Sequence, residues 1–94
     1  MTKTERHEQL CNQIHDIYIK KNHDYGDSFG QTYDKLGIIS AITRISDKYN
    51  RLVSLGTGQE QMVQDEKIED TLLDMANYCL MTVIEIQNQK ENQN

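Results

Sequence analysis

The sequence predicts an all-α fold, an antiparallel bundle of three main helices with a short fourth. Its 94 residues contain no proline, the residue that most strongly interrupts helices. Apolar residues recur at spacings of three and four in three long stretches, and no stretch alternates as a strand does. A chain of this length forms one domain. We expect residues 1–88 to be that domain and residues 89–94 to be a polar, disordered tail.

The first helix is expected to open at Thr2 and to run to about Lys21. Thr2 and Glu5 have the spacing of a capping box, in which each side chain accepts a hydrogen bond from the other residue's amide. An apolar stripe at helical spacing follows on one face. It consists of Leu10, Ile14, Ile17 and Tyr18.

A row of turn-forming residues predicts a loop over residues 20–30, KKNHDYGDSFG. The loop carries lysines and aromatic side chains, which can donate to a phosphate and stack on a base. The plainer interpretation is a connection whose Tyr25 and Phe29 fill the core. A short helical turn is expected at residues 33–36, before Gly37.

The next helix is expected from Ile38 to about Leu55, because apolar residues recur there at spacings of four, three, four and three residues. Gly56 and Gly58 end it, and residues 56–64 form a loop. Its polar face is charged. The residues of that face are Arg44, Asp47, Lys48 and Arg51.

The last helix is expected from about Asp65 to Gln89 and is rich in carboxylates at its start. Projected at ~100° per residue, three of them lie on the polar side, one turn apart. Glu69 instead falls inside the apolar arc, where a carboxylate needs a partner, a metal ion or a proton. We therefore expect Glu69 to be buried. The three carboxylates on the polar side are Glu66, Asp70 and Asp74.

Composition narrows the classes of function. A net charge of −5 argues against nucleic-acid binding, which needs a basic surface. Local cations can still hold a small phosphorylated ligand. The modest apolar content indicates a thin core, which we expect a homo-oligomer to complete. Cys11 and Cys79 are expected to be buried, reduced thiols. No leader or membrane-spanning run is recognisable, so we expect a cytoplasmic protein without membrane contact.

Three carboxylates at successive turns repel one another, so something positive is expected among them. One candidate is Mg²⁺, which prefers hard oxygen ligands. The other is the cationic group Arg44, Lys48 and Arg51 on the preceding helix. With a metal, the helix could clamp phosphates and activate a water molecule; with arginines, the carboxylates are structural. No nucleophile–base pair, P-loop or dinucleotide motif is visible, so the sequence names no catalytic residue.

Three segments resemble a known family. They are DYGDSF at residues 24–29, RISDKYNRL at 44–52 and EDTLLDMANY at 69–78. In this order they are similar to the "nucleotide modification associated" family of small phage and bacterial all-α domains, over roughly residues 17–86. The resemblance implies a role near nucleotides in a phage or prophage, and hence in the cytoplasm of a bacterial host. It does not supply a reaction.

A weaker resemblance is to the MazG-like all-α nucleotide pyrophosphohydrolases. Those enzymes bind Mg²⁺ through carboxylates on two consecutive helices, typically an ExxE followed by an ExxD. Here Lys67 stands where an ExxD ending at Asp70 needs its glutamate, and the preceding helix offers only Asp47. The resemblance carries a metal-ligand role to Asp70. Further candidate ligands are Asp47, Glu66, Glu69 and Asp74.

Three hypotheses follow. The first is a phage-type protein that binds a nucleotide-derived ligand without hydrolysis, by analogy with small phage proteins that sequester cyclic-nucleotide or ADP-ribose-derived immune signals and so counter host defence. The second is a Mg²⁺-dependent, MazG-like pyrophosphohydrolase. The third is a protein-binding inhibitor of a host factor. The ligand contacts expected under the first hypothesis are Lys21, Asp24, Tyr25, Arg44, Asp47, Lys48, Arg51 and Tyr78.

Overall fold

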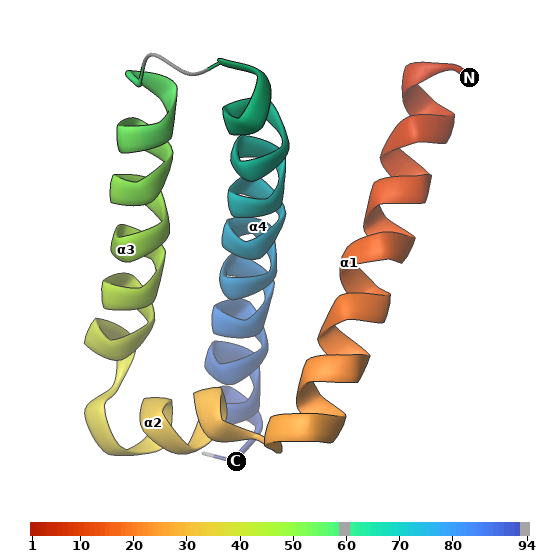
Figure 1. Cartoon of the computed structure of the whole chain (residues 1–94). Coiled ribbons are helices and arrows are strands. Elements are labelled where there is room, and N and C mark those ends of the chain that lie inside the picture. The colour runs from red at the N-terminus through yellow and green to blue at the C-terminus, as the bar shows by residue number, and fades with distance from the viewer. Residues whose placement is uncertain (59–60, 93–94) are drawn as a thin grey trace.

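The computed structural model describes residues 1–58 and 61–92, which form four helices (Figure 1). The part of the chain that it describes contains no strand, so the all-α prediction is confirmed. None of the described helices combines the length and the apolar character that crossing a bilayer requires. The helices are α1 (Lys3–Tyr25), α2 (Ser28–Leu36), α3 (Ile38–Gly56) and α4 (Gln61–Asn92).

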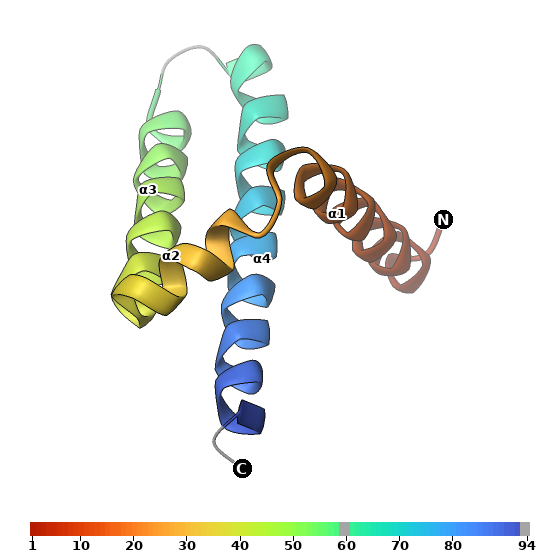
Figure 2. The ribbon, with the colours of Figure 1, turned by 90° about the horizontal axis from the view of Figure 1, so that it is seen from below.

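The long helices lie side by side, with α4 between α3 and α1 (Figures 1 and 2). The helices α3 and α4 are antiparallel and make the most extensive contact of the molecule. By contrast, α1 approaches α4 near its own C-terminal end and diverges from it toward the N-terminus. The short α2 crosses at the same end and joins α1 to α3. Both the α1–α2 turn and α2 therefore close one end of the layer.

The core lies where α2 meets α3 and α4. Phe29, Tyr33 and Ala41 form its buried cluster, and Ala41 has no exposed surface at all (0 %). Two threonines of α4 are also buried, and each hydroxyl donates to the carbonyl one turn earlier: Thr71 to Lys67, and Thr82 to Tyr78, both at 2.7 Å. Small side chains at the α3–α4 contact let the two helices approach closely.

The predicted loop at residues 20–30 is mostly helical. The capping box of Thr2 and Glu5 opens α1 as expected, but the helix passes Lys21 and ends only at Gly26, whose φ of 65° leaves the helical region. Residues that favour turns can occupy the last turn of α1. The helix ends at Gly26 because its positive φ is a conformation that glycine adopts easily. Asp27 then caps α2 by accepting a hydrogen bond from the Gly30 amide at 3.2 Å.

The last helix is also longer than predicted. It begins at Gln61 and ends at Asn92, so residues 89–92 of the expected tail are helical, and residues 93–94 lie outside the described residues. Similarly, Gly56 is the last residue of α3, and residues 59–60 of the expected loop lie outside the described range. The contact with α3 and the uninterrupted helix-forming sequence extend α4 at both ends.

Two expectations about burial were wrong. Glu69 is exposed, and so are both cysteines, which are free thiols. The apolar arc of α4 is wider than the face that α3 covers. For example, Leu72 and Leu80 are exposed on the same helix. Within one chain, the Glu69 carboxylate therefore remains hydrated and needs no partner.

Gly37 joins α2 to α3 with φ 72° and ψ −160°, a region essentially reserved for glycine. We expect Gly37→Ala to lower the free energy of unfolding by about 1–3 kcal/mol through backbone strain. Urea unfolding measures the loss. Gly56→Ala is the matched control, because Gly56 ends α3 with open space around its Cα and an added methyl favours the helix. Equal destabilisation by both substitutions would contradict the assignment of strain to Gly37.

Candidate functional site

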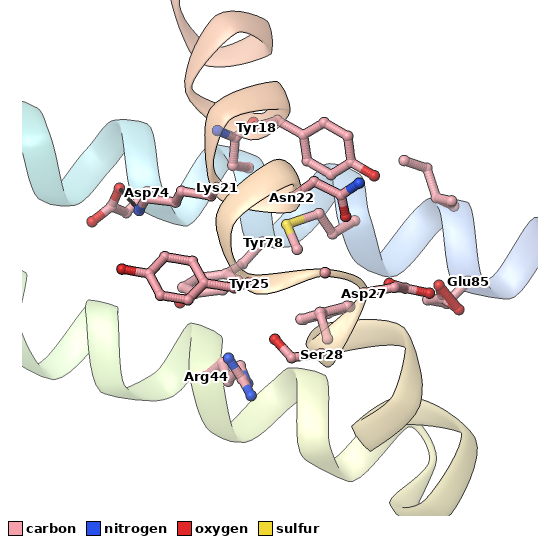
Figure 3. Close-up of a pocket in the computed structure, with 15 residues that line it drawn as sticks. Tyr18, Lys21, Asn22, Tyr25, Asp27, Ser28, Arg44, Asp74, Tyr78 and Glu85 are labelled. Atoms are coloured by element: carbon pink, nitrogen blue, oxygen red, sulfur yellow. Dashed lines mark ion pairs between the residues drawn. The ribbon is translucent and has the colours of Figure 1, made fainter.

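A cavity of about 390 Å³ opens between the C-terminal half of α1, the α1–α2 turn, α3 and α4 (Figure 3). Its volume falls in the range of small-molecule sites. All four helices contribute to its wall. The lining residues are Tyr18, Lys21, Asn22, Tyr25, Gly26, Asp27, Ser28, Phe29, Arg44, Asp74, Asn77, Tyr78, Met81, Ile84 and Glu85.

Arg44 of α3 is held against two aromatic rings in this cavity. The rings of Phe29 and Tyr78 stack with centroids 6.0 Å apart and planes inclined by 21°. The guanidinium carbon of Arg44 lies 5.7 Å from the Phe29 centroid and 6.0 Å from that of Tyr78. These cation–π distances fix the side chain. The planar guanidinium keeps its N–H donors for another group.

One end of the cavity is cationic. Asp74 of α4 accepts a hydrogen bond from Lys48 of α3 at 3.2 Å and forms a second ion pair with Lys21 of α1 at 3.7 Å. Within the described ranges, Arg44 has no carboxylate within 4.0 Å. Two lysines thus share one carboxylate and Arg44 lies beside them, which leaves an excess of two positive charges beside a half-enclosed cavity. Such an excess attracts anions.

The other end of the cavity is acidic. Figure 3 shows Asp27 and Glu85 across the cavity from Lys21 and Asp74. Burial, followed by the charges of Asp27 and Asp34, raises the pKa of the Glu85 carboxyl. Asp27 also caps α2. The cavity therefore presents hydrogen-bond donors at one end and carboxylates at the other.

The raised pKa of Glu85 has a consequence for stability. Because the folded state disfavours the ionised carboxylate, stability falls as pH rises from the ordinary carboxyl pKa of about 4.3 through the higher folded value. We expect Glu85→Gln to raise the free energy of unfolding at pH 7 by about 0.2–1 kcal/mol and to change it little near pH 3.5, where both side chains are neutral. Urea unfolding at both pH values measures this.

The matched control for Glu85→Gln is Glu69→Gln, because Glu69 lies on the same helix and is exposed. It should show no gain that depends on pH. If the wild type and Glu85→Gln had the same stability curve from pH 3.5 to 7, ionised Glu85 would carry no penalty in the fold.

Comparison with known proteins assigns the family. The family described as "Nucleotide modification associated domain 1" matches residues 21–86. The chain belongs to this family. The family segment, residues 21–86, contains every cavity-lining residue except Tyr18. No curated protein and no solved structure matches the chain, and the weaker MazG-like resemblance is not found by these comparisons.

Of the predicted ligand contacts, four line the cavity together. They are Lys21, Tyr25, Arg44 and Tyr78. Lys48 joins them through its bond to Asp74. The structure brings these residues from α1, α3 and α4 to one place.

Three other predicted contacts lie elsewhere in the family segment. Asp24 does not line the cavity; its carboxylate is 3.3 Å from Nδ1 of His23 on the exposed end of α1. Asp47 and Arg51 are exposed on α3 and do not line the cavity either. Arg51 lies on nearly the same side of α3 as Arg44 but two turns, roughly 10 Å, farther along the helix, whereas Asp47 is turned ~60° around the helix from Arg44.

The carboxylates proposed as metal ligands do not come together. Glu66, Glu69 and Asp70 are exposed and lie outside the cavity lining. Asp74, the carboxylate at the cationic end, is bound to two lysines. In residues 1–58 and 61–92, no three His, Cys, Asp or Glu side chains are grouped to hold a metal ion. The sequence offered two candidate partners for these carboxylates, Mg²⁺ and the cationic group on α3. In the described residues, one contact with that cationic group is formed, between Lys48 and Asp74.

Sequence reasoning missed polar residues on the cavity side of α4. Asn77 and Glu85 both interrupt apolar runs of that helix, and that interruption was the available signal. The Asn77 amide donates to the Ile14 carbonyl of α1 at 2.9 Å, and so ties the two helices together. Other missed lining residues lie in α1, in the turn after it and at the start of α2. They are Tyr18, Asn22, Asp27 and Ser28.

Proposed function

We propose that the protein binds a small, phosphorylated, nucleotide-derived ligand in this cavity. The observation that carries the proposal is the Arg44 guanidinium, held over two rings and facing the cavity without a carboxylate partner in the described ranges. A guanidinium offers phosphate two parallel hydrogen bonds. Lys21 lines the same cavity and adds a second donor.

The remaining lining residues suit the rest of a nucleotide. Tyr25 is 74 % exposed at the rim of the cavity, where a ring can stack on a base. Asp27 and Glu85 can accept hydrogen bonds from amino groups or sugar hydroxyls. We therefore propose an orientation with the phosphate at Arg44 and Lys21, and the sugar or base toward Glu85. The family name supports a role near nucleotides.

We further propose that the ligand is held without being hydrolysed. The cationic end contains donors for phosphate, and its one carboxylate is bound to lysines, so the lining offers no evident base to activate water there. Sequestration of a nucleotide-derived signal in a phage-infected bacterium would be one use of such a site.

Calorimetric titration against a panel of ligands tests binding. The panel contains nucleoside mono-, di- and triphosphates, cyclic mono- and dinucleotides and ADP-ribose, with unphosphorylated nucleosides as matched controls. We expect at least one phosphorylated compound to bind, and its nucleoside to bind at least about tenfold more weakly, because charged hydrogen bonds contribute ~1.5–3 kcal/mol. Binding of no member, or equal binding of a nucleoside and its phosphate, would argue against the proposal.

Chromatography of the ligand after incubation tests whether it is retained unchanged. We expect its full recovery, with or without added Mg²⁺. Conversion that requires Mg²⁺ and stops in Asp70→Asn would instead favour a pyrophosphohydrolase, and would overturn the proposal of sequestration while leaving that of binding intact.

A further inference from the structure

The α3–α4 pair has an apolar face that no other described part of the chain covers. Large side chains recur along it at helical spacing, with Tyr49 56 % and Leu72 47 % exposed. We call the following set the apolar face: Ile42, Tyr49 and Val53 of α3, with Leu72, Cys79 and Val83 of α4. Scattered apolar residues are ordinary on a surface, but a continuous two-helix patch indicates an interaction site.

The apolar face lies away from the cavity. At ~100° per residue, Ile42 and Tyr49 lie roughly 100–160° around α3 from Arg44 and Lys48, the residues that face the cavity side. On α4, Leu72 lies ~160° from Asp74 by the same count. Figures 1 and 2 show α3 and α4 side by side, with α1 on the far side of α4 from α3, so the two sides of the α3–α4 pair are separate surfaces. The cavity uses one side, and the apolar face is on the other.

The chain also exposes more surface than a folded monomer of its size. Its accessible surface is 7471 Å², whereas a compact protein of 11.0 kDa exposes about 5,600 Å². Its Cα radius of gyration is 15.3 Å, against about 12 Å for a compact domain of this length. The excess surface is larger than the ~800 Å² that each partner contributes to a standard interface.

We propose that the apolar face binds the same face of a second copy of this chain, so that two α3–α4 pairs complete a four-helix bundle. A two-fold axis would place like surface against like surface. The six side chains of the apolar face are uncharged, so the centre of the contact carries no like-charge repulsion, although each chain has a net charge of −5. The exposed Glu69, one turn before Leu72, lies at the edge of the apolar face. Each cavity stays open on the outer side of its own layer.

This pairing also accounts for the thin core. Only Phe29, Tyr33 and Ala41 form the buried apolar cluster in the described part of one chain. Half-exposed side chains on α3 and α4 would become the core of the pair, as in other bundles built from helical hairpins. The proposal concerns a different surface from the cavity and does not depend on ligand binding.

Sedimentation equilibrium of the full chain and thiol labelling test the proposal together. We expect a mass twice the 11.0 kDa of one chain. Both cysteines are exposed in a single chain, but only Cys79 lies on the apolar face. With a maleimide reagent and mass spectrometry, Cys79 should react at least about tenfold more slowly than Cys11, which serves as the internal control.

Tyr49→Glu should place a charge at the centre of the interface, give a single-chain mass and bring the reactivity of Cys79 to that of Cys11. Ile19→Glu is the matched control, since Ile19 is 51 % exposed on α1, away from the apolar face; it should keep the double mass. Helical circular dichroism separates dissociation from unfolding. A single-chain mass of the wild type, or an oligomer in which Cys79 reacts as fast as Cys11, would overturn the proposal.

Discussion

Replacing Phe29 by alanine is expected to destabilise the protein more than any other single truncation. Phe29 is 6 % exposed, stacks on Tyr78 and carries Arg44 over its ring. Phe→Ala substitutions in cores cost about 3–5 kcal/mol through lost transfer energy and the cavity left behind. Because small domains have only about 5–15 kcal/mol of stability, Phe29→Ala should remove a large part of it and lower the urea midpoint clearly.

Urea unfolding followed by circular dichroism measures this effect, with all variants at one protein concentration, since association would add to the apparent stability. Tyr25→Ala is the matched aromatic control, and because Tyr25 is largely exposed we expect a change within about 0.5 kcal/mol. If Phe29→Ala lost less than about 1 kcal/mol, the cluster around Phe29 would not be the core.

Replacing Arg44 by glutamine is expected to have the largest effect on ligand binding. Glutamine keeps two N–H donors but loses the charge and the planar fork. Since a hydrogen bond to a charged group contributes ~1.5–3 kcal/mol, the dissociation constant of the best ligand should rise about 10–150-fold. Titration calorimetry with the ligand identified from the panel measures it.

Arg51→Gln is the matched control for Arg44→Gln. It makes the same chemical change on the same helix, at an exposed position outside the cavity. We expect the dissociation constant to change less than about threefold, since exposed charges contribute little. Equal losses in both variants would indicate a diffuse electrostatic effect, and no loss in Arg44→Gln would place the phosphate elsewhere.

The spacing of apolar residues was sufficient to predict the three long helices, though not their ends, and the helical face that carries Arg44 and Lys48. Such periodicity is local and survives in the fold. Lys21 and Tyr25 were also singled out, because lysines and aromatics are unusual in a plain connection, although they lie in α1 and not in the loop that was predicted. The structure brings these residues, with Tyr78, to one cavity.

The errors have a common physical cause. Periodicity shows which side chains could be covered, but not which ones a neighbouring helix covers. Glu69 and Cys79 lie in or beside an apolar arc and yet are exposed, because α3 covers only the part of α4 around Thr71 and Thr82. Likewise, the sequence offered Lys48 as one of three candidate cations for three carboxylates but could not select its pairing with Asp74, since helix-to-helix register depends on contacts between residues distant in the chain.

The way in which α1 is attached has a consequence for the energetics of the cavity. No side chain of α1 is buried; the Asn77 amide and the Lys21–Asp74 ion pair tie it to α4. Its helix therefore depends on its own capping box more than on the core, and its amide hydrogens should exchange through local opening well before global unfolding. Since α1 forms one wall of the cavity, a ligand that contacts Lys21 and Arg44 together would also hold this helix closed. Its measured affinity would include the free energy of that ordering.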